Sequence, residues 1–407
     1  MSQAAATQIL TAASCILLLA LMLDPRCRQA LSRLPNLRLA LFGLAALLLT
    51  CLVQFAPLML CMAPPPAWAR ADMVTIDPQW STRAIVAMGA SLAFFLIGAV
   101  LGVDPKRAKT LMFTLGLLLL VVFGLAVFDY WQETLRPRPS GAPDVLRLDG
   151  AFQSANTLAS LWILGLLLSV GYGLAQAPRR GGRGRSPITI MSFVVGLVCF
   201  LGLLASMSRA GIAIGVVMLG VLGFVAWPER RLAIGATSLA FGVCIALVGI
   251  FGAQLGLPLR QIDLLGSVLT RLPEWQAALD LTLMRPCLGW GVGSFGLSVE
   301  AVRQAPLQSL SLVSVTPHNL FLLIVSETGI AGLVAWGVLA SGLWRAARPA
   351  FLRHQIVWPS ALALGCVGVI LHNLVDFSLA VPATACAFSI VLGLLVSQAA
   401  VRPKKMR

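Results

Sequence analysis

Apolar runs long enough to cross a membrane recur from one end of the 407-residue chain to the other. A helix needs about 20 predominantly apolar residues to cross the hydrocarbon core, and roughly eleven runs approach or exceed that length. They lie at 5–23, 38–62, 84–103, 110–128, 156–175, 188–206, 210–227, 232–251, 318–343, 357–375 and 380–400. The pattern predicts an all-α, polytopic bundle of about 11–12 transmembrane helices. It excludes a soluble enzyme, a disordered chain and a β-barrel, whose strands alternate apolar and polar residues.

A formal net charge of +15 makes nucleic acid the first partner to test. When the loops between the runs are assigned alternately to the two sides of a membrane, most Lys and Arg residues fall on one side. They occupy short loops such as 26–38, 106–109 and 179–185. This is the positive-inside pattern, so the charge indicates topology and contact with membrane lipids, and no nucleic-acid partner is predicted. The first run lacks a basic leader, and we interpret it as a retained helix.

The longest loop, 252–317, lies on the other, outer side and contains no full span. We treat residues 1–407 as a single integral membrane domain that includes this loop. Within the loop, Pro273 is followed by Trp275, Ala278, Leu279 and Leu283, which predicts an amphipathic helix with these side chains on its apolar face. The glycine-rich stretch 289–295 comes next, and by itself it indicates no more than a loop, since no strand precedes it.

One histidine stands where the outer loop returns to the membrane. In Thr316-Pro317-His318-Asn319 we predict that Thr316 caps a helix and Pro317 occupies its first position. His318 would then lie in the first turn, where the positive end of the helix dipole keeps an imidazole neutral and able to accept a proton. The same helix end favours a nearby phosphate.

Arginines on the outer side supply the second signal. Arg209 sits in the tight break between two spans, Arg271 precedes the amphipathic helix, and Arg147 precedes a polar stretch that ends at Asn156. Guanidinium groups bind phosphate oxygens in a bidentate way and stay charged near a membrane, so two or three of them beside a histidine would bind a diphosphate. The outer loops offer no clustered carboxylates and the chain has no Walker A sequence, so we predict neither a metal nor a cofactor.

Four motifs in this order resemble those of the O-antigen ligase and polymerase superfamily. They are Gly150-Ala151-Phe152 to Asn156, Ser208-Arg209-Ala210-Gly211, Arg271 to Trp275 with Gly289 to Phe295, and Pro317-His318-Asn319-Leu320 followed by Glu327-Thr328-Gly329. The resemblance covers roughly residues 147–345. It implies a multi-pass protein of the bacterial inner membrane whose active site, and whose loop 252–317, face the periplasm.

The resemblance also implies a function. Family members transfer a glycan from undecaprenyl diphosphate, without a metal, and the ligase among them uses lipid A-core as the acceptor. Carried over, His318 is the catalytic base, Arg209 and Arg271 bind the diphosphate, and Arg147, Asn156, Asn319 and Glu327 support the site. We favour the ligase over the polymerase, which uses the same donor but a different hydroxyl. A transporter for lipid-linked glycans is the alternative from another class.

Overall fold

The computed structural model describes residues 12, 16, 23–34, 36–57, 73–135, 147–152, 154–177, 186–227, 271–302, 316–352 and 357–400. The chain forms two compact parts. The first part comprises residues 1–100, 267–349 and 373–407, and the second part comprises residues 101–266 and 350–372.

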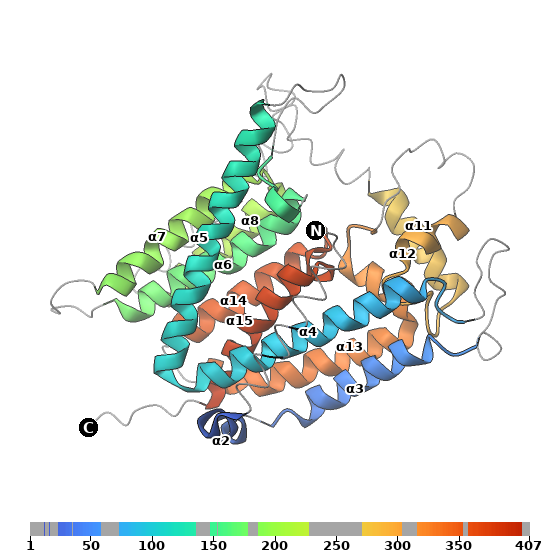
Figure 1. Cartoon of the computed structure of the whole chain (residues 1–407), viewed down its shortest axis with the longest axis horizontal. Helices are drawn as coiled ribbons and strands as arrows, with labels where there is room; N and C mark the ends of the chain where they lie inside the picture. The colour runs from blue at the N-terminus through green and yellow to red at the C-terminus, as the bar shows by residue number, and fades with distance from the viewer. Residues whose placement is uncertain are drawn as a thin grey trace. The chain divides into compact units, whose positions relative to one another are not determined.

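The first part joins helices from both ends of the chain with those of the long loop (Figure 1). They are α2 (Pro25–Arg33), α3 (Arg38–Val53), most of α4 (Pro78–Val103), α11 (Leu272–Met284), α12 (Phe295–Ser298), the 3-10 helices η4 (Val299–Ala301) and η6 (Ser378–Ala380), most of α13 (Leu320–Leu352), and α15 (Pro382–Ala400).

Glycines allow two antiparallel helix pairs of the first part to approach backbone to backbone. A Cβ added at Gly43 of α3 would collide with the backbone of α13 at Leu339, and one at Gly342 would collide with the backbone at Ala40. The pair α4 and α15 meets in the same way at Gly98 and Gly393. Small residues at helix contacts are the usual basis of packing within a membrane, where burial of apolar surface gives no driving force.

The second part is a bundle around one central helix. It contains α5 (Pro105–Leu135), the 3-10 helix η2 (Gly150–Phe152), α6 (Ala155–Gln176), α7 (Pro187–Ala205), α8 (Arg209–Ala226) and α14 (Val357–His372). Helix α6 contacts α7, α8 and α14, and nearly all its residues are buried. Serine hydroxyls cap three of these helices: Ser154 for α6, Ser186 for α7 and Ser208 for α8.

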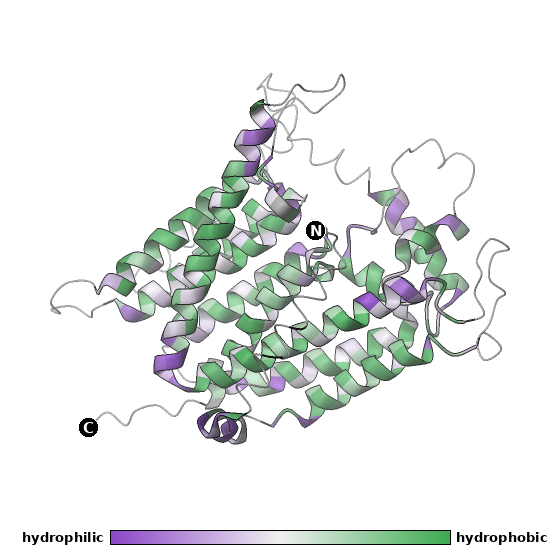
Figure 2. Ribbon diagram, viewed as in Figure 1, coloured by the Kyte–Doolittle hydropathy of each residue, from purple (hydrophilic) through white to green (hydrophobic). Residues whose placement is uncertain are grey.

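The chain is an all-α polytopic membrane bundle, as predicted. Seven of the described helices are long and apolar enough to cross a membrane, and the described residues form no strand. Apolar residues dominate these helices along most of their length (Figure 2). The described helices match nine of the predicted runs, although α3 ends at Val53, well before the end of the run 38–62. The run 232–251, and nearly all of 5–23, lie outside the described residues.

Helix α13 is broken at Gly329, which has φ 64° and ψ −166°. The backbone groups that the break leaves without helical partners are bonded by the stretch 286–291. Trp290 N donates to Ser326 O, and Gly291 N donates to Glu327 O (3.1 and 2.9 Å). In return Ile330 N and Ala331 N donate to the carbonyls of Pro286 and Cys287 (2.8 and 3.1 Å). We call this arrangement the interlock of 286–291 with α13.

Gln54, which caps the C-terminal end of α3, completes the interlock. Its Nε2 donates to Leu288 O and Glu327 O, both at 2.7 Å, and its Oε1 accepts from Val292 N at 2.9 Å. The side chain is fully buried, so an apolar substitute would remove all three bonds. Leu288 O and Val292 N would lose the partner that Gln54 provides, whereas Glu327 O would still accept from Gly291 N.

The long loop is partly helical, as predicted, but α11 buries only part of the predicted face, Ala278 fully and Trp275 partly. Ala277, Ala278 and Leu281 are its buried residues, and they pack on Trp290, Phe295 and Leu323 in one core cluster. Leu279 and Leu283, which were expected on that face, are 50% and 78% exposed. A hydrophobic pattern identifies apolar positions but does not distinguish protein contacts from lipid contacts.

Candidate functional site

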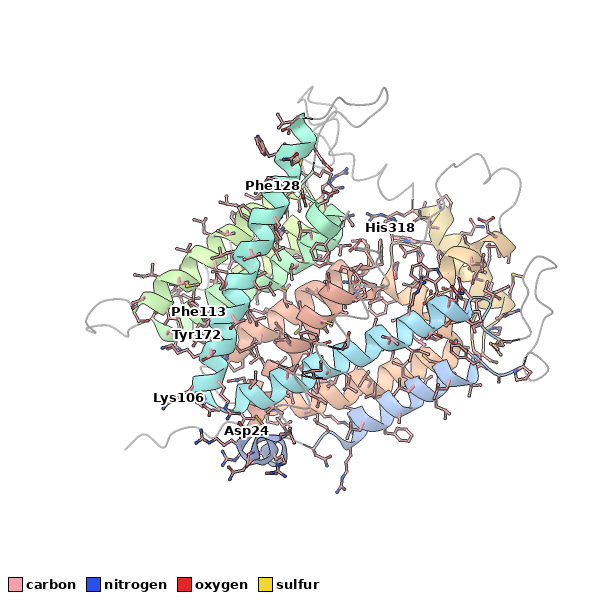
Figure 3. The ribbon with its side chains drawn as sticks, viewed as in Figure 1. Asp24, Lys106, Phe113, Phe128, Tyr172 and His318 are labelled. Atoms are coloured by element: carbon pink, nitrogen blue, oxygen red, sulfur yellow. The ribbon has the colours of Figure 1, made fainter. Side chains whose placement is uncertain are left out.

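His318 lies just before α13, at the end of the helix that packs on α11 (Figure 3). The predicted cap is wrong. Asn319 is the N-terminal cap of α13, because its Oδ1 accepts from Phe321 N and Leu322 N (2.9 and 3.1 Å), and the helix begins at Leu320. Asparagine is among the strongest capping residues. His318 therefore precedes the helix and has a left-handed backbone (φ 47°), which is uncommon for a residue with a side chain.

Asn319 also joins α13 to the chain that follows α14. Its Nδ2 donates to Leu374 O at 2.8 Å, and Leu320 N donates to Asn373 O at 3.0 Å. These bonds bring the segment 373–377 beside His318. Within that segment the Phe377 ring meets the His318 ring edge to face, with centroids 5.1 Å apart. Asn319 thus caps α13 and bridges it to the segment 373–377.

The imidazole of His318 is held in its neutral form. Burial, and then the positive charge of Arg271, lower the pKa of His318 from 6.5 to about 4. Nδ1 of His318 is buried and has no hydrogen-bond partner among the described residues. The neutral state is the predicted one, but burial and Arg271 produce it, and not a place in the first turn of a helix.

Arg271 lies at the N-terminal end of α11 and is half-buried. Burial lowers the pKa of its guanidinium, while the carboxylates of Asp376 and Glu274 oppose that shift. An arginine remains charged even so, because its ordinary pKa is above 12. Arg271 is thus close enough to lower the pKa of His318, and its own charge is balanced by Asp376 and Glu274.

Asp376 is a member of this cluster that the sequence reasoning missed. It is fully buried, its Oδ2 accepts from Ser378 N at 3.1 Å, and its Oδ1 has no partner among the described residues. Burial raises the pKa of Asp376 to about 6, against the lowering effects of backbone hydrogen bonds and of Arg271. The available signal was a single acid at the end of the apolar run 357–375, on the outer side. We call Arg271, His318 and Asp376 the His318 cluster.

Arg209 belongs to the second part of the chain and begins α8. The turn before it, 206–208, contains Met207 with a left-handed backbone (φ 51°). Arg147 braces this turn: its Nε donates to Ser206 O at 3.0 Å, and its Nη2 donates to Asn156 Oδ1 at 2.9 Å. The structure therefore brings Arg147 and Asn156 together at the base of the Arg209 turn, with two guanidinium nitrogens of Arg147 engaged by the protein itself.

Glu327, predicted as a supporting residue, lies in the first part of the chain at the break of α13. It is buried, and its Oε1 accepts from Phe295 N at 3.1 Å. Its backbone carbonyl accepts from Gly291 N and from Gln54, so both side chain and backbone belong to the interlock. The glycine-rich stretch 289–295 is a loop that leads into α12, and its Gly289, Gly291 and Gly293 all have positive φ and pack against neighbouring chain.

Groups of three or more His, Cys, Asp or Glu side chains suited to a metal do not occur in the described ranges. The chemistry on offer there is that of a neutral imidazole, a buried carboxyl and guanidinium groups.

These features define a class: a multi-pass helical membrane protein with ionisable residues gathered where its apolar helices begin and end. A family model described as O-Antigen ligase matches residues 193–337 of the 407-residue chain. The match confirms the predicted resemblance to the O-antigen ligase and polymerase superfamily and includes Arg209, Arg271, His318 and Glu327. Arg147, Asn156 and Asp376 lie outside it. No curated protein matches the chain.

Proposed function

We propose that this protein is an O-antigen ligase of the bacterial inner membrane, with its active site and its loop 252–317 facing the periplasm. It transfers a glycan from undecaprenyl diphosphate to a hydroxyl group of lipid A-core. The observation that carries the proposal is the His318 cluster, in which a half-buried neutral imidazole lies near an arginine and a carboxyl group. That set matches the needs of a transfer in which a hydroxyl loses a proton and a diphosphate departs.

His318 is the proposed general base. It takes the proton of the acceptor hydroxyl, whose oxygen attacks the anomeric carbon from the face opposite the diphosphate, so the anomeric configuration inverts. A pKa of about 4 makes the free imidazole a weak base. Arg271 causes part of that depression, and an anionic donor bound to Arg271 would offset its charge. We infer that donor binding raises the pKa of His318 and so activates the base only when a substrate is present.

Arg271 and Arg209 are the proposed ligands of the diphosphate. Fixed guanidinium groups would stabilise the charge that develops as the diphosphate leaves, which is the task of a metal in other enzymes. Asp376 would keep the Arg271 side chain in place, because its negative charge favours the charged form of a guanidinium that is partly removed from water. The proposal thus requires no metal.

The test is a transfer assay with the purified full-length protein in detergent and EDTA, using a lipid-linked glycan donor with and without lipid A-core. We expect a donor-to-core product, and we expect His318→Ala to lower the rate by about 10²–10⁴-fold, the usual contribution of a general base. His354 lies outside the described residues, in the loop that the sequence assigns to the inner side, so His354→Ala is the matched control and should retain the wild-type rate.

Each other outcome points elsewhere. Glycan lengthening without lipid A-core would identify a polymerase that uses the same donor. A fully active His318→Ala variant would contradict the mechanism. Folded wild-type protein that transfers to no acceptor would favour transport of the lipid-linked glycan, for which the broken helix α13 is the supporting observation.

A further inference from the structure

The turn that precedes Arg209 is strained and yet firmly held. Met207 has φ 51°, a conformation that is unfavourable for a residue with a side chain and persists only where its surroundings impose it. Leu148 N donates to Ala205 O at 3.1 Å, and Ser208 N donates to Ser206 Oγ at 3.3 Å. Such a turn fixes the direction in which α8, and with it Arg209, begins.

Ser208 is the residue at which the turn becomes a helix. Its Oγ accepts from Gly211 N at 3.4 Å and so caps α8. A Cβ added at Gly211 would lie 3.0 Å from that oxygen and 2.9 Å from the Ala159 side chain, so the cap is packed tightly against α6. Ser208 is 3% exposed, and water cannot replace its partners.

His372 holds Ser208 from a third helix. It is the last residue of α14, is 1% exposed, and lies in the second part of the chain with the Arg209 turn. Its Nε2 is 3.2 Å from Ser208 Oγ, and its Nδ1 is 2.7 Å from Ser160 Oγ of α6. One imidazole thus ties the ends of α14 and α8 to the middle of the bundle through two different nitrogens.

We propose that His372 is a positioning residue for Arg209 and that it acts through Ser208. The inference rests on the proposed function, in which Arg209 binds the donor diphosphate. Bidentate binding of a phosphate depends on the orientation of the guanidinium plane, and that orientation follows from where α8 begins. Of the two bonds that His372 makes, the one from Nε2 carries this role, and the one from Nδ1 only anchors the ring.

Two amide substitutions separate the bonds. In His372→Asn the amide reaches the position of Nδ1, so the bond to Ser160 is kept and the one to Ser208 is lost. In His372→Gln the amide reaches the position of Nε2, so the bond to Ser208 is kept and the one to Ser160 is lost. Each variant removes one hydrogen bond from the same buried site, and a purely structural role predicts equal effects.

The experiment measures binding of undecaprenyl diphosphate, and the transfer rate, for the full-length variants in detergent. We expect His372→Asn to weaken binding and raise the donor KM by about tenfold, the usual consequence of leaving one buried partner unsatisfied. His372→Gln should stay within about threefold of wild type. Ser160→Ala is the control and should lower the melting temperature without changing the donor KM.

Equal losses in His372→Gln and His372→Asn, or losses that follow the melting temperature, would overturn the proposal. If His372→Asn fails to fold, Ser208→Ala removes the same bond from the other side, and an unchanged donor KM there would also overturn it. Failure of the proposed function looks different: wild-type protein would bind undecaprenyl diphosphate but transfer nothing, and the binding comparison would still apply. Arg209→Gln must weaken binding of undecaprenyl diphosphate. If it does not, Arg209 is not a ligand of the diphosphate, and the proposed role of His372 is overturned.

Discussion

The His318 cluster and the Arg209 turn have similar backbone conformations but differ in how their polar groups are bonded. Among the described residues, His318 and Met207 are the two with side chains that have positive φ, and each lies immediately before a polar helix cap, Asn319 or Ser208. In the His318 cluster, Nδ1 of His318 and Oδ1 of Asp376 are buried and have no hydrogen-bond partner among the described residues. Around the Arg209 turn, the backbone and the bracing side chains are joined by hydrogen bonds.

This difference indicates which of the two regions contacts the reacting atoms of the substrate. A buried polar atom without a partner costs about 1–3 kcal/mol, and a catalytic role is one of the reasons for which a protein retains such an atom. Fully bonded polar networks instead fix geometry. We therefore assign the reacting atoms to the His318 cluster and the precise presentation of a charge to the Arg209 turn. Each prediction below tests that division.

The largest effect is expected from Asp376→Asn. The amide oxygen can still accept from Ser378 N, but the negative charge that balances Arg271 is lost. The transfer rate should fall by about 10²–10³-fold, the range found when one preorganised electrostatic group is removed. Asp149→Asn, beside Arg147 in the second part of the chain, is the matched control and should change the rate only a few-fold. Equal losses in a transfer assay would abolish the distinction between the two regions.

Disrupting the interlock should lower the stability of the fold more than it affects the chemistry of the His318 cluster or of the Arg209 turn. A Cβ at Gly289, which has φ 67°, would collide with the backbone of Glu327, so Gly289→Ala should destabilise the fold by at least about 1–3 kcal/mol. Gly337→Ala is the control, because Gly337 lies in α13, the helix that contains Glu327, and a Cβ added there would meet no atom within 4 Å. Thermal unfolding in detergent measures both variants. A melting temperature of Gly289→Ala equal to that of wild type would show that the interlock is not rigid.

The sequence was sufficient for the fold class because crossing a membrane imposes its own length and composition on each helix. It also identified His318 and Arg271 as candidates, because ionisable side chains are uncommon in apolar surroundings. It was not sufficient for Asp376, because the return of the chain after α14 brings that residue beside a histidine far away in the sequence. Nothing local marks such a contact.

Other features escaped prediction because two local preferences competed. Thr316 and Asn319 are both good helix caps, and only the bridge from Asn319 to Leu374 decides between them. A glycine-rich stretch is equally typical of a mobile loop and of one held at positive φ by close packing. Tertiary contacts make these choices, and a single sequence does not display them.

The pH dependence separates the two titrating members of the His318 cluster. A carboxyl with a pKa of about 6 is neutral below that pH, so Arg271 loses its balancing charge there. An imidazole with a pKa of about 4 accepts a proton from the acceptor only above that pH. We expect kcat/KM to be level above about pH 7 and to fall up to about tenfold per pH unit below about pH 6, since kcat/KM follows ionisations of the free enzyme.

Asp376→Asn should abolish the fall of kcat/KM near pH 6, so that kcat/KM falls only close to pH 4. Initial rates measured from about pH 4.5 to 8.5 test both profiles. If kcat/KM of Asp376→Asn still falls near pH 6.5, the ordinary pKa of histidine, then His318 is solvated. Such a fall would thereby contradict the buried, neutral imidazole on which the comparison depends.

The smallest effect is expected from Arg147→Lys. An ammonium group cannot reproduce the fork that bonds Ser206 O and Asn156 Oδ1 together, so one of these bonds is lost while the charge remains. One hydrogen bond contributes about 0.5–1.5 kcal/mol, so kcat/KM should fall by about two- to tenfold. Asn156→Ala removes one of the same two bonds and should give a loss of the same size. A loss as large as that of Arg209→Gln would mean that Arg147 contacts the donor itself, and the Arg209 turn would then bind substrate with the residues that we assign to holding it.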